Sequence, residues 1–573
     1  EKLTLKIASV IGTNFQRSLL SEIHPLSDAQ LLVPAQLEKL EQAQLIQLES
    51  ADPEWEYMFR NVIMQEVVYE GLLLAQRRQL HAIVASALEA VIPDEVERLA
   101  FHYSRSDNWD KALHYLNLAV QKARKEYANQ AAIQQHSLIL DCLVNLSSAD
   151  KTKPVISTEY WDHLMERAKL YGLLGRRDEE IDDLGTLGIM AEALDDTQRR
   201  ALAAKQWAYL YETSGDYISS LEMIERSVQL AQSVGDEALI GDGYNYWGKL
   251  LYLYGEYETA HTYLQQSLQL AQQLQDKRAQ ADSLNSLGLV AHYQADYDVA
   301  LYFFNEAIEL WQAIGDQVGF GTSLCNRGRV RYDLGEYGLT QTLYQEALMV
   351  HRKIGDRAGE AFVHHNLGQL QRTLGNYETA QSYFQAALAF FNSIGDSRRK
   401  AHTLAHLGFL YIRLETYETA RLYLKDALDL FRELHDPWTL GKALIYYGWM
   451  LIDLDKLDEA KSYFEESLAI GNDLDQEPMK IENLVNLAHI ALTQQDEEAV
   501  QTYIEPILAF IKKKGIAGIE HPAKVYLTLY QLLQDTEQSD QAQTILQEGQ
   551  QYLSSRVTDL DPSLRQSYLT LIP

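Results

Sequence analysis

The chain has 573 residues, 46% of them hydrophobic, and a formal net charge of −31 at pH 7. This charge argues against nucleic-acid binding, which gains most of its affinity from phosphate contacts, and the length suits an extended array better than a single core. The two cysteines, Cys142 and Cys325, lie far apart, and we find neither a signal peptide nor an apolar run of about 18 residues. We therefore expect a cytoplasmic protein without disulfides or membrane contact. Because the chain begins at Glu1 rather than Met, we also expect it to be part of a longer protein.

Residues 1–92 differ from the rest of the chain. The predicted elements are three short helices and two strands, at 3–11, 14–23, 28–42, 45–49 and 54–59. Helices followed by a small hairpin have the outline of a winged helix. The third helix carries Glu38 and Glu41 against a lone Lys39, whereas a DNA-reading helix is basic or rich in donors. We therefore expect a winged-helix-like module or helical linker that does not bind DNA.

The next part of the chain is predicted to hold degenerate helices, at 93–145. Within it, residues 107–112 resemble the turn and second-helix start of a helical repeat. Residues 144–158 are rich in Asn, Ser, Asp and Lys and contain a proline, which is typical of a loop, so we predict a boundary there. A two-helix unit around Gly175 follows and opens an array predicted over 159–472.

From about residue 196 to 472, one pattern recurs every 40 residues without insertion or deletion. Such self-similarity indicates a solenoid of stacked units. Each unit is predicted to be two helices joined by a tight turn, with a Gly-Asp pair ending one unit and capping the next. Residues 473–573 are predicted to be divergent repeats closed by a cap at 559–565. The glycines of the frame mark close approaches of paired helices and are Gly248, Gly288, Gly328, Gly368, Gly408 and Gly448.

These residues resemble the tetratricopeptide repeat family, whose units carry a small–aromatic–small pattern. The usual unit has about 34 residues, so this chain is similar to a variant with longer helices. The resemblance implies an all-α fold, apart from the N-terminal hairpin: a right-handed superhelix, or α-solenoid. In one unit the pattern maps onto Leu284, Leu287, Gly288, Tyr297, Ala300, Phe304 and Ala307.

A second resemblance covers residues 1–145. It is carried by five segments, at 5–12, 59–69, 77–81, 99–103 and 127–129. They are similar to the region after the nucleotide-binding module in bacterial signalling ATPases of the STAND class, often fused to adenylate/guanylate cyclase domains. In those proteins a P-loop switch is followed by a winged helix and a tetratricopeptide sensor. The family usually has His where Asn61 stands; if that His contacts nucleotide phosphate, Asn61 argues against such sensing here.

The second resemblance implies a sensor or scaffold region of a multidomain signal-transduction ATPase. A freestanding scaffold for protein–protein interaction, without a nucleotide switch, is the alternative. The resemblance concerns fold and context, and no residue of this chain demonstrates the switch.

The sequence offers no catalytic constellation. Residues 243–250 have most of the spacing of a phosphate-binding loop, but they are predicted to lie mid-helix, and Leu250 replaces the hydroxyl that would hold magnesium. His402 and His406 have the spacing of helical metal ligands, yet both fall at structural positions of the repeat. We find no HExxH, CxxC or nucleophile elbow. We therefore expect no enzyme activity, cofactor or metal in this chain.

The remaining candidate for a functional site is the concave groove of the predicted repeat array. In the tetratricopeptide family, the first helix of each unit lines the concave face, and aromatic and Arg side chains dominate binding hot spots. Residues 316–400 hold ten Lys and Arg against eight acids, a net of +2 in a chain of −31. We hypothesise that the groove binds a protein or peptide partner, through an acidic segment, or a small anionic effector, with Arg329, Arg372 and Arg413 as anchors. The alternative is that these arginines pair with acids on adjacent helices. The predicted groove residues are Asn245, Tyr252, Asn285, His292, Tyr293, Arg329, Tyr332, His365, Arg372, Phe409, Arg413 and Trp449.

Overall fold

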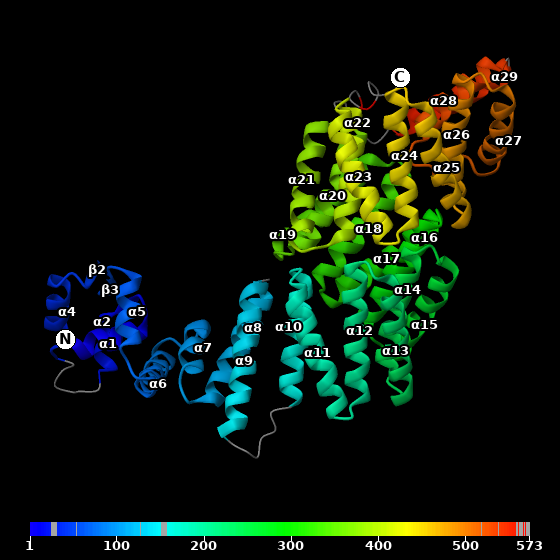
Figure 1. The fold of residues 1–573 in the computed structure, drawn as a ribbon. Helices are drawn as coiled ribbons and strands as arrows, with labels where there is room; N and C mark the ends of the chain where they lie inside the picture. The colour runs from blue at the N-terminus through cyan, green and yellow to red at the C-terminus, as the bar shows by residue number, and fades with distance from the viewer. Residues whose placement is uncertain are drawn as a thin grey trace. The chain divides into compact units, whose positions relative to one another are not determined.

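The computed structural model describes residues 1–24, 31–52, 54–126, 128–149, 157–516, 518–536 and 538–556, with Leu560, Arg565 and Tyr568. The chain divides into two compact units, Glu1–Gly172 with Arg177–Met190, and Leu173–Arg176 with Ala191–Pro573 (Figure 1). Among the helices of the described ranges, none is long and apolar enough to cross a bilayer. The predicted all-α solenoid with a small N-terminal module is confirmed.

The first unit begins with a small mixed module and continues as helices. Its elements are α1 (Lys2–Ile11), β1 (Asn14–Gln16), α2 (Arg17–Glu22), α4 (Val33–Gln42), β2 (Ile46–Ser50), β3 (Glu56–Phe59), α5 (Val62–Glu70), α6 (Leu74–Val91), α7 (Val96–Ser104), α8 (Trp109–Lys125), α9 (Asn129–Ala149), α10 (Thr158–Leu173) and α11 (Arg177–Ala193). The three strands form an antiparallel sheet in the order β1-β3-β2.

Two sequence predictions in this unit are wrong in detail. Asn14–Gln16 was predicted to be helical, but it pairs with β3 because the Phe15 ring, 2% exposed, packs on Tyr57 and Phe59 at centroid distances of 6.1 and 5.8 Å. The loop predicted from residue 144 begins later, because α9 continues to Ala149. Parts of the predicted helix at 28–42 and of the predicted cap at 559–565 lie outside the described residues.

The second unit is an array of helix pairs. Its elements are α12 (Thr197–Ser214), α13 (Tyr217–Val234), α14 (Glu237–Leu253), α15 (Tyr257–Gln273), α16 (Lys277–Tyr293), α17 (Tyr297–Ile314), α18 (Gln317–Asp333), α19 (Tyr337–Lys353), α20 (Arg357–Thr373), α21 (Tyr377–Ser393), α22 (Ser397–Arg413), α23 (Tyr417–Glu433), α24 (Pro437–Asp453), α25 (Leu457–Asp473), α26 (Glu477–Thr493), α27 (Glu497–Lys514), α28 (Pro522–Asp535) and α29 (Ser539–Arg556).

The frame glycines set the distance between the two helices of a pair. A Cβ added at Gly368 of α20 would lie 2.7 Å from the ring of Phe384, which is fully buried on α21. Between units, Gly315 adopts φ 74° after α17, and the Asp316 carboxylate accepts a hydrogen bond from the Gly319 N–H at 2.9 Å. The Gly-Asp junctions therefore act as the predicted C-cap and N-cap.

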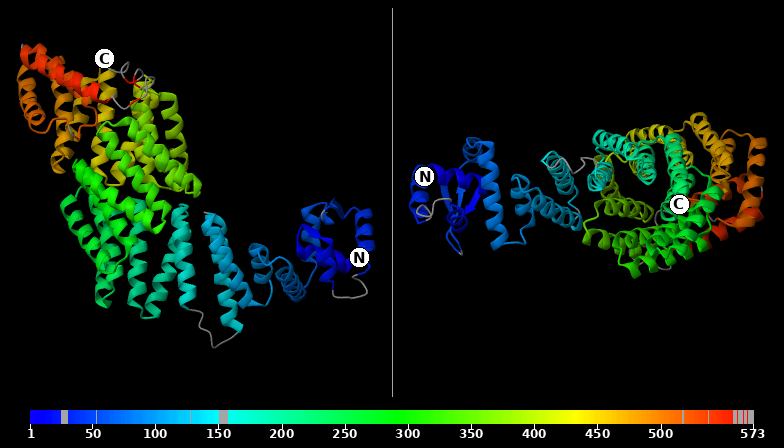
Figure 2. Two further views of the ribbon diagram at one scale, coloured as in Figure 1. Left: turned by 180° about the vertical axis from the view of Figure 1, so that it is seen from behind. Right: turned by 90° about the horizontal axis from the view of Figure 1, so that it is seen from below.

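The pairs wind into a superhelix whose successive turns touch. A Cβ at Gly215 would lie 2.8 Å from the Leu434 side chain, and one at Gly255 would lie 2.7 Å from that of Leu474. The partners in each contact are 219 residues apart, so one superhelical turn takes between five and six 40-residue units. In the right-hand view of Figure 2, the helices of this unit form a ring.

Candidate functional site

The first helices of successive pairs enclose a cavity of about 910 Å³ in the second unit. Most of the wall comes from α12, α14, α16, α18, α20, α22, α24 and α26, joined by residues 518–520 of the α27–α28 connector. The glycine side of each first helix packs against its partner helix, so the opposite face, with its polar and aromatic side chains, turns inward. Pockets of about 300–1,000 Å³ accommodate small molecules and cofactors.

Seven Lys and Arg side chains line the cavity. Four of them pair with carboxylates, as Lys205–Asp242, Arg398–Asp436, Arg399–Asp396 and Lys442–Glu520. The other three are Lys249, Arg329 and Arg372, and no carboxylate of the described residues lies within ion-pair distance of them. These three side chains therefore place positive charge on the wall without a direct ion pair, although Asp333 and Glu520 of the same wall lie close enough to interact with Arg329 and Arg372 electrostatically.

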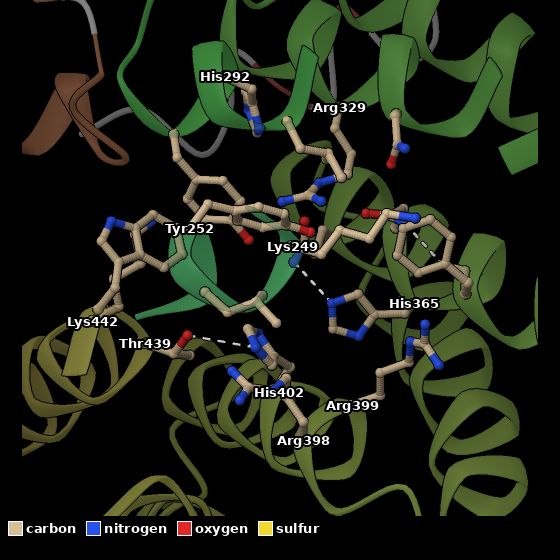
Figure 3. A pocket seen from close by; sticks show the side chains of 18 of the residues that line it. Lys249, Tyr252, His292, Arg329, His365, Arg398, Arg399, His402, Thr439 and Lys442 are labelled. Atoms are coloured by element: carbon tan, nitrogen blue, oxygen red, sulfur yellow. Dashed lines mark hydrogen bonds between the residues drawn. The ribbon is translucent and has the colours of Figure 1, made fainter. Parts of the chain in front are cut away.

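The surroundings of these cations are aromatic and polar. The Arg372 guanidinium donates to His406 Nδ1 at 3.1 Å and lies 4.3 Å from the centre of the Phe409 ring. Figure 3 shows Lys249 and Arg329 reaching into one space, on different helices of the wall. The guanidinium groups are held by rings and neutral acceptors, so they remain available to an acidic group.

Four histidines of the wall are polar but uncharged groups at neutral pH. Burial lowers the pKa of His292, His365, His402 and His406, to about 3 for His402. Across the described ranges, no three or more His, Cys, Asp and Glu side chains are grouped so that they could hold a metal ion. The histidines therefore contribute hydrogen-bonding capacity to the wall without adding positive charge.

Eight of the twelve predicted groove residues line the cavity. The other four do not: Asn245 is buried, Phe409 and Trp449 pack on each other with ring centroids 5.5 Å apart, and Arg413 is exposed and donates to the Tyr377 hydroxyl at 3.4 Å. The eight lining residues are Tyr252, Asn285, His292, Tyr293, Arg329, Tyr332, His365 and Arg372.

Sequence reasoning missed three charged parts of the site. Lys249 lies in the stretch with phosphate-loop spacing, where α14 is a continuous helix, so that motif is a chance match. Glu482 and Glu520 were not singled out either. One signal could have identified the second of them: the α27–α28 connector has seven residues, whereas the α25–α26 connector has three.

Comparison with known proteins supports the repeat assignment. The tetratricopeptide repeat model matches residues 239–313, 320–393, 374–433 and 399–473. A search of curated protein sequences gives no match.

Similar solved structures include BtubC from P. vanneervenii (17% identity, 40% of this chain and 92% of that chain, TM-score 0.34). They also include the apo form of RapI (12% identity, 48% of this chain and 98% of that chain, TM-score 0.38). A third is a Rap protein complexed with competence and sporulation factor (12% identity, 64% of this chain and 99% of that chain, TM-score 0.45). The family-model matches identify residues 239–313 and 320–473 as tetratricopeptide repeats.

Proposed function

We propose that the second unit recognises an anionic segment of a protein or peptide partner inside the cavity. The observation that carries the proposal is the set of three lining cations, Lys249, Arg329 and Arg372, without a carboxylate partner among the described residues. A guanidinium withdrawn from water gains strong, bidentate hydrogen bonds when it meets a carboxylate. Tyr252 and Tyr332 of the same wall supply rigid aromatic surface of the type found in binding hot spots.

We further propose that this recognition belongs to the sensor region of a cytoplasmic signal-transduction ATPase. Ligand binding in the array would then bias a nucleotide switch elsewhere in the parent protein, as a coupling between two distinct sites. The support is the resemblance of residues 1–145 to the winged-helix region of such ATPases. A freestanding scaffold is the alternative. Finding GxxxxGK[ST] between a strand and a helix upstream of Glu1 in the gene would favour the sensor, and a start codon just before Glu1 would favour the scaffold.

The binding proposal is tested by affinity selection from a random peptide library on the immobilised chain. Peptides with Asp, Glu or a free C-terminal carboxylate should be enriched. Replacing Arg329 and Arg372 together by Gln should weaken binding of the selected peptides about 10-fold or more, since a hydrogen bond to a charged group contributes about 1.5–3 kcal/mol. Replacing Lys353 and Lys425, exposed on α19 and α23, by Gln is the matched control and should leave affinity unchanged.

Two outcomes would contradict the proposal. One is selection of uncharged peptides with blocked termini as strongly as acidic ones. The other is equal affinity of the Arg329/Arg372 variant and the Lys353/Lys425 variant, because both remove two positive charges from the chain. Circular dichroism should show that both variants keep the helical content of the native chain. Binding of free dicarboxylates as tightly as peptides would identify a small anionic effector instead.

A further inference from the structure

The connector between α27 and α28 contributes three consecutive residues to the cavity wall, whereas short repeat junctions such as the one between α25 and α26 contribute single residues such as Gln476. The junction between α25 and α26 has three residues, whereas α27 ends at Lys514 and α28 begins at Pro522. Gly518, Ile519 and Glu520 of this longer connector line the cavity, and a Cβ added at Gly518 would lie 2.8 Å from Pro478 of α26 and 3.3 Å from Ala295, in the junction between α16 and α17. The chain thus places a piece of its own irregular backbone where the proposed partner binds.

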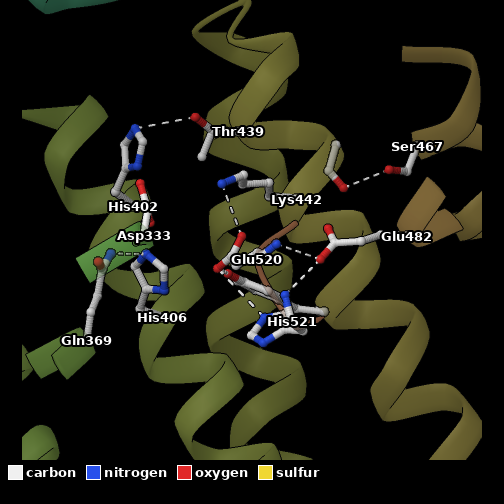
Figure 4. Close-up of polar contacts among 12 residues, drawn as sticks. Asp333, Gln369, His402, His406, Thr439, Lys442, Ser467, Glu482, Glu520 and His521 are labelled. Carbon is white, nitrogen blue, oxygen red and sulfur yellow. Dashed lines mark hydrogen bonds and ion pairs between the residues drawn. The ribbon is translucent and has the colours of Figure 1, made fainter. Parts of the chain in front are cut away.

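The C-terminal end of this connector makes the kinds of hydrogen bond and ion pair that a bound peptide makes with its receptor. The Glu520 carboxylate lies 3.1 Å from Lys442 Nζ and accepts a hydrogen bond from the Tyr446 hydroxyl. The backbone N–H groups of Glu520 and His521 both donate to Oε1 of Glu482, each at 2.9 Å. Figure 4 shows Glu482, on α26, and Lys442, on α24, on either side of Glu520.

The neighbouring histidine adds an aromatic contact. The His521 ring lies 4.7 Å from Trp449, 5.0 Å from Phe409 and 6.1 Å from Tyr446, measured between ring centroids. Backbone donors on an acid, an acidic side chain on a cation, and a ring in an aromatic cluster are three ways in which peptides are recognised. Here, all three are satisfied by two consecutive residues of the chain itself, Glu520 and His521.

We infer that Gly518–His521 is an internal occupant of the site, with Gly518–Glu520 at the cavity wall and His521 in the aromatic cluster beside it, and that an acidic partner segment displaces it by exchanging its own carboxylate for that of Glu520 at Lys442 and Tyr446. The inference rests on the proposed function, because it assigns the regulation of the same site. An internal segment competes at a high effective concentration, so it raises the affinity that a partner must have. The ligand class follows from the sequence of the occupant: a peptide with a carboxylate side chain next to a branched aliphatic side chain, as in Ile519-Glu520.

The experiment uses the full chain and a fluorescent peptide with the occupant's own sequence, acetyl-Gly-Ile-Glu-His-amide. Glu520→Gln keeps the shape of the side chain but removes its charge, so the peptide should bind this variant at least tenfold more tightly than the native chain. The same peptide with Gln in place of Glu should show no such gain. Glu498→Gln, an exposed change of equal charge on α27, is the control and should behave like the native chain. Equal peptide affinity in all three proteins would overturn the inference.

Hydrogen exchange gives a second readout on the native chain. At saturation with a peptide selected from the library, the amide hydrogens of Glu520 and His521 should exchange at least tenfold faster, since displacement removes their bonds to Glu482. If library peptides bind through Arg329 and Arg372 while these amides keep their protection, the displacement is wrong and the proposed function stands. If no acidic peptide binds any variant, both fail.

Discussion

The ion pair between Arg398 and Asp436 lies where one superhelical turn meets the next. Arg398 donates Nη1 to Asp436 at 2.8 Å and Nη2 to the hydroxyl of Tyr254 at 2.9 Å, and Tyr254 is 144 residues earlier in the chain. The two charged side chains are only 14% and 4% exposed. Replacing Arg398 by Ala should therefore loosen the contact between turns and leave a carboxylate buried without its counter-charge.

The neighbouring pair sets the scale of the effect. Removing one partner of a buried ion pair destabilises a protein by about 3–5 kcal/mol, whereas an exposed pair contributes about 0–1 kcal/mol. Arg399 pairs with Asp396 at the same 2.8 Å, but its side chain is 53% exposed. Arg399→Ala is therefore a matched control, with the same residue type at the adjacent position. It should lower the free energy of unfolding by about 1 kcal/mol or less.

The pH dependence of the Arg398 variant follows from Asp436. Burial raises the pKa of Asp436 even beside the guanidinium, so the folded chain binds this proton more tightly than the unfolded chain does. A raised folded pKa means that the penalty is absent below the unfolded pKa and grows as the pH rises through the folded pKa. The loss of stability caused by Arg398→Ala should therefore be larger at neutral than at mildly acidic pH. Adding Asp436→Asn, which keeps a capping side chain, should recover most of it.

Urea unfolding followed by circular dichroism measures these differences as changes in midpoint and free energy of unfolding. Equal losses for Arg398→Ala and Arg399→Ala at neutral pH would refute the reasoning. So would a loss in Arg398→Ala that does not shrink on acidification.

Two further predictions concern packing and the thiols. Gly288→Ala should lower the free energy of unfolding by about 1–3 kcal/mol, because the added Cβ would lie 2.7 Å from the fully buried Phe304 ring. The control is Gly241→Ala, whose added Cβ would have its nearest neighbour at 3.4 Å. This variant should be more stable than the native chain by up to about 1 kcal/mol, because Ala has the higher helix propensity. Urea midpoints that move in the same direction for both would contradict this. Burial raises the pKa of Cys142 and Cys325 to about 12, so iodoacetamide should label neither in the native chain and both after unfolding; rapid native labelling would contradict it.

The repeat array could be predicted because its determinants are local in sequence. A frame glycine such as Gly368 and the ring it meets, Phe384, are 16 residues apart within one unit, so a single 40-residue period contains both. The same holds for the junction in which Asp316 caps α18. First-helix positions could likewise be assigned to the concave face, which is why Arg329 and Arg372 were among the predicted residues that line the cavity.

The enclosure of the cavity could not be predicted, because it depends on contacts between turns. Gly215 meets Leu434 at a separation of 219 residues, and that spacing is set by the small rotation between units, which no single repeat encodes. Asn14–Gln16 was missed for a similar reason: its strand needs β3, more than 40 residues later. The position of Arg413 depends on how far along α22 the cavity extends, and its side chain is exposed beside Tyr377 instead.

Glu482 makes the stability of the second unit depend on pH. Its side chain is 5% exposed, and burial, together with the carboxylate of Glu520, raises its pKa from 4.5 to about 7. Lys442 and the backbone N–H groups of Glu520 and His521 oppose that shift without cancelling it. Because the folded pKa is raised, the stabilisation is complete below about pH 4.5 and is lost as the pH rises through about 7. The full loss is on the order of 3 kcal/mol.

A variant that cannot ionise separates this titration from all others. Glu482→Gln keeps the amide oxygen as an acceptor for both N–H groups but carries no charge at any pH. It should unfold at higher urea than the native chain at pH 8, and its stability should vary less between pH 6 and pH 8. Glu498→Gln, exposed on α27, should retain the native pH profile. A native chain whose free energy of unfolding is constant over this range would show that Glu482 does not titrate near neutrality. The hydrogen bonds between Glu482 and the backbone of Glu520 and His521 would then not depend on pH.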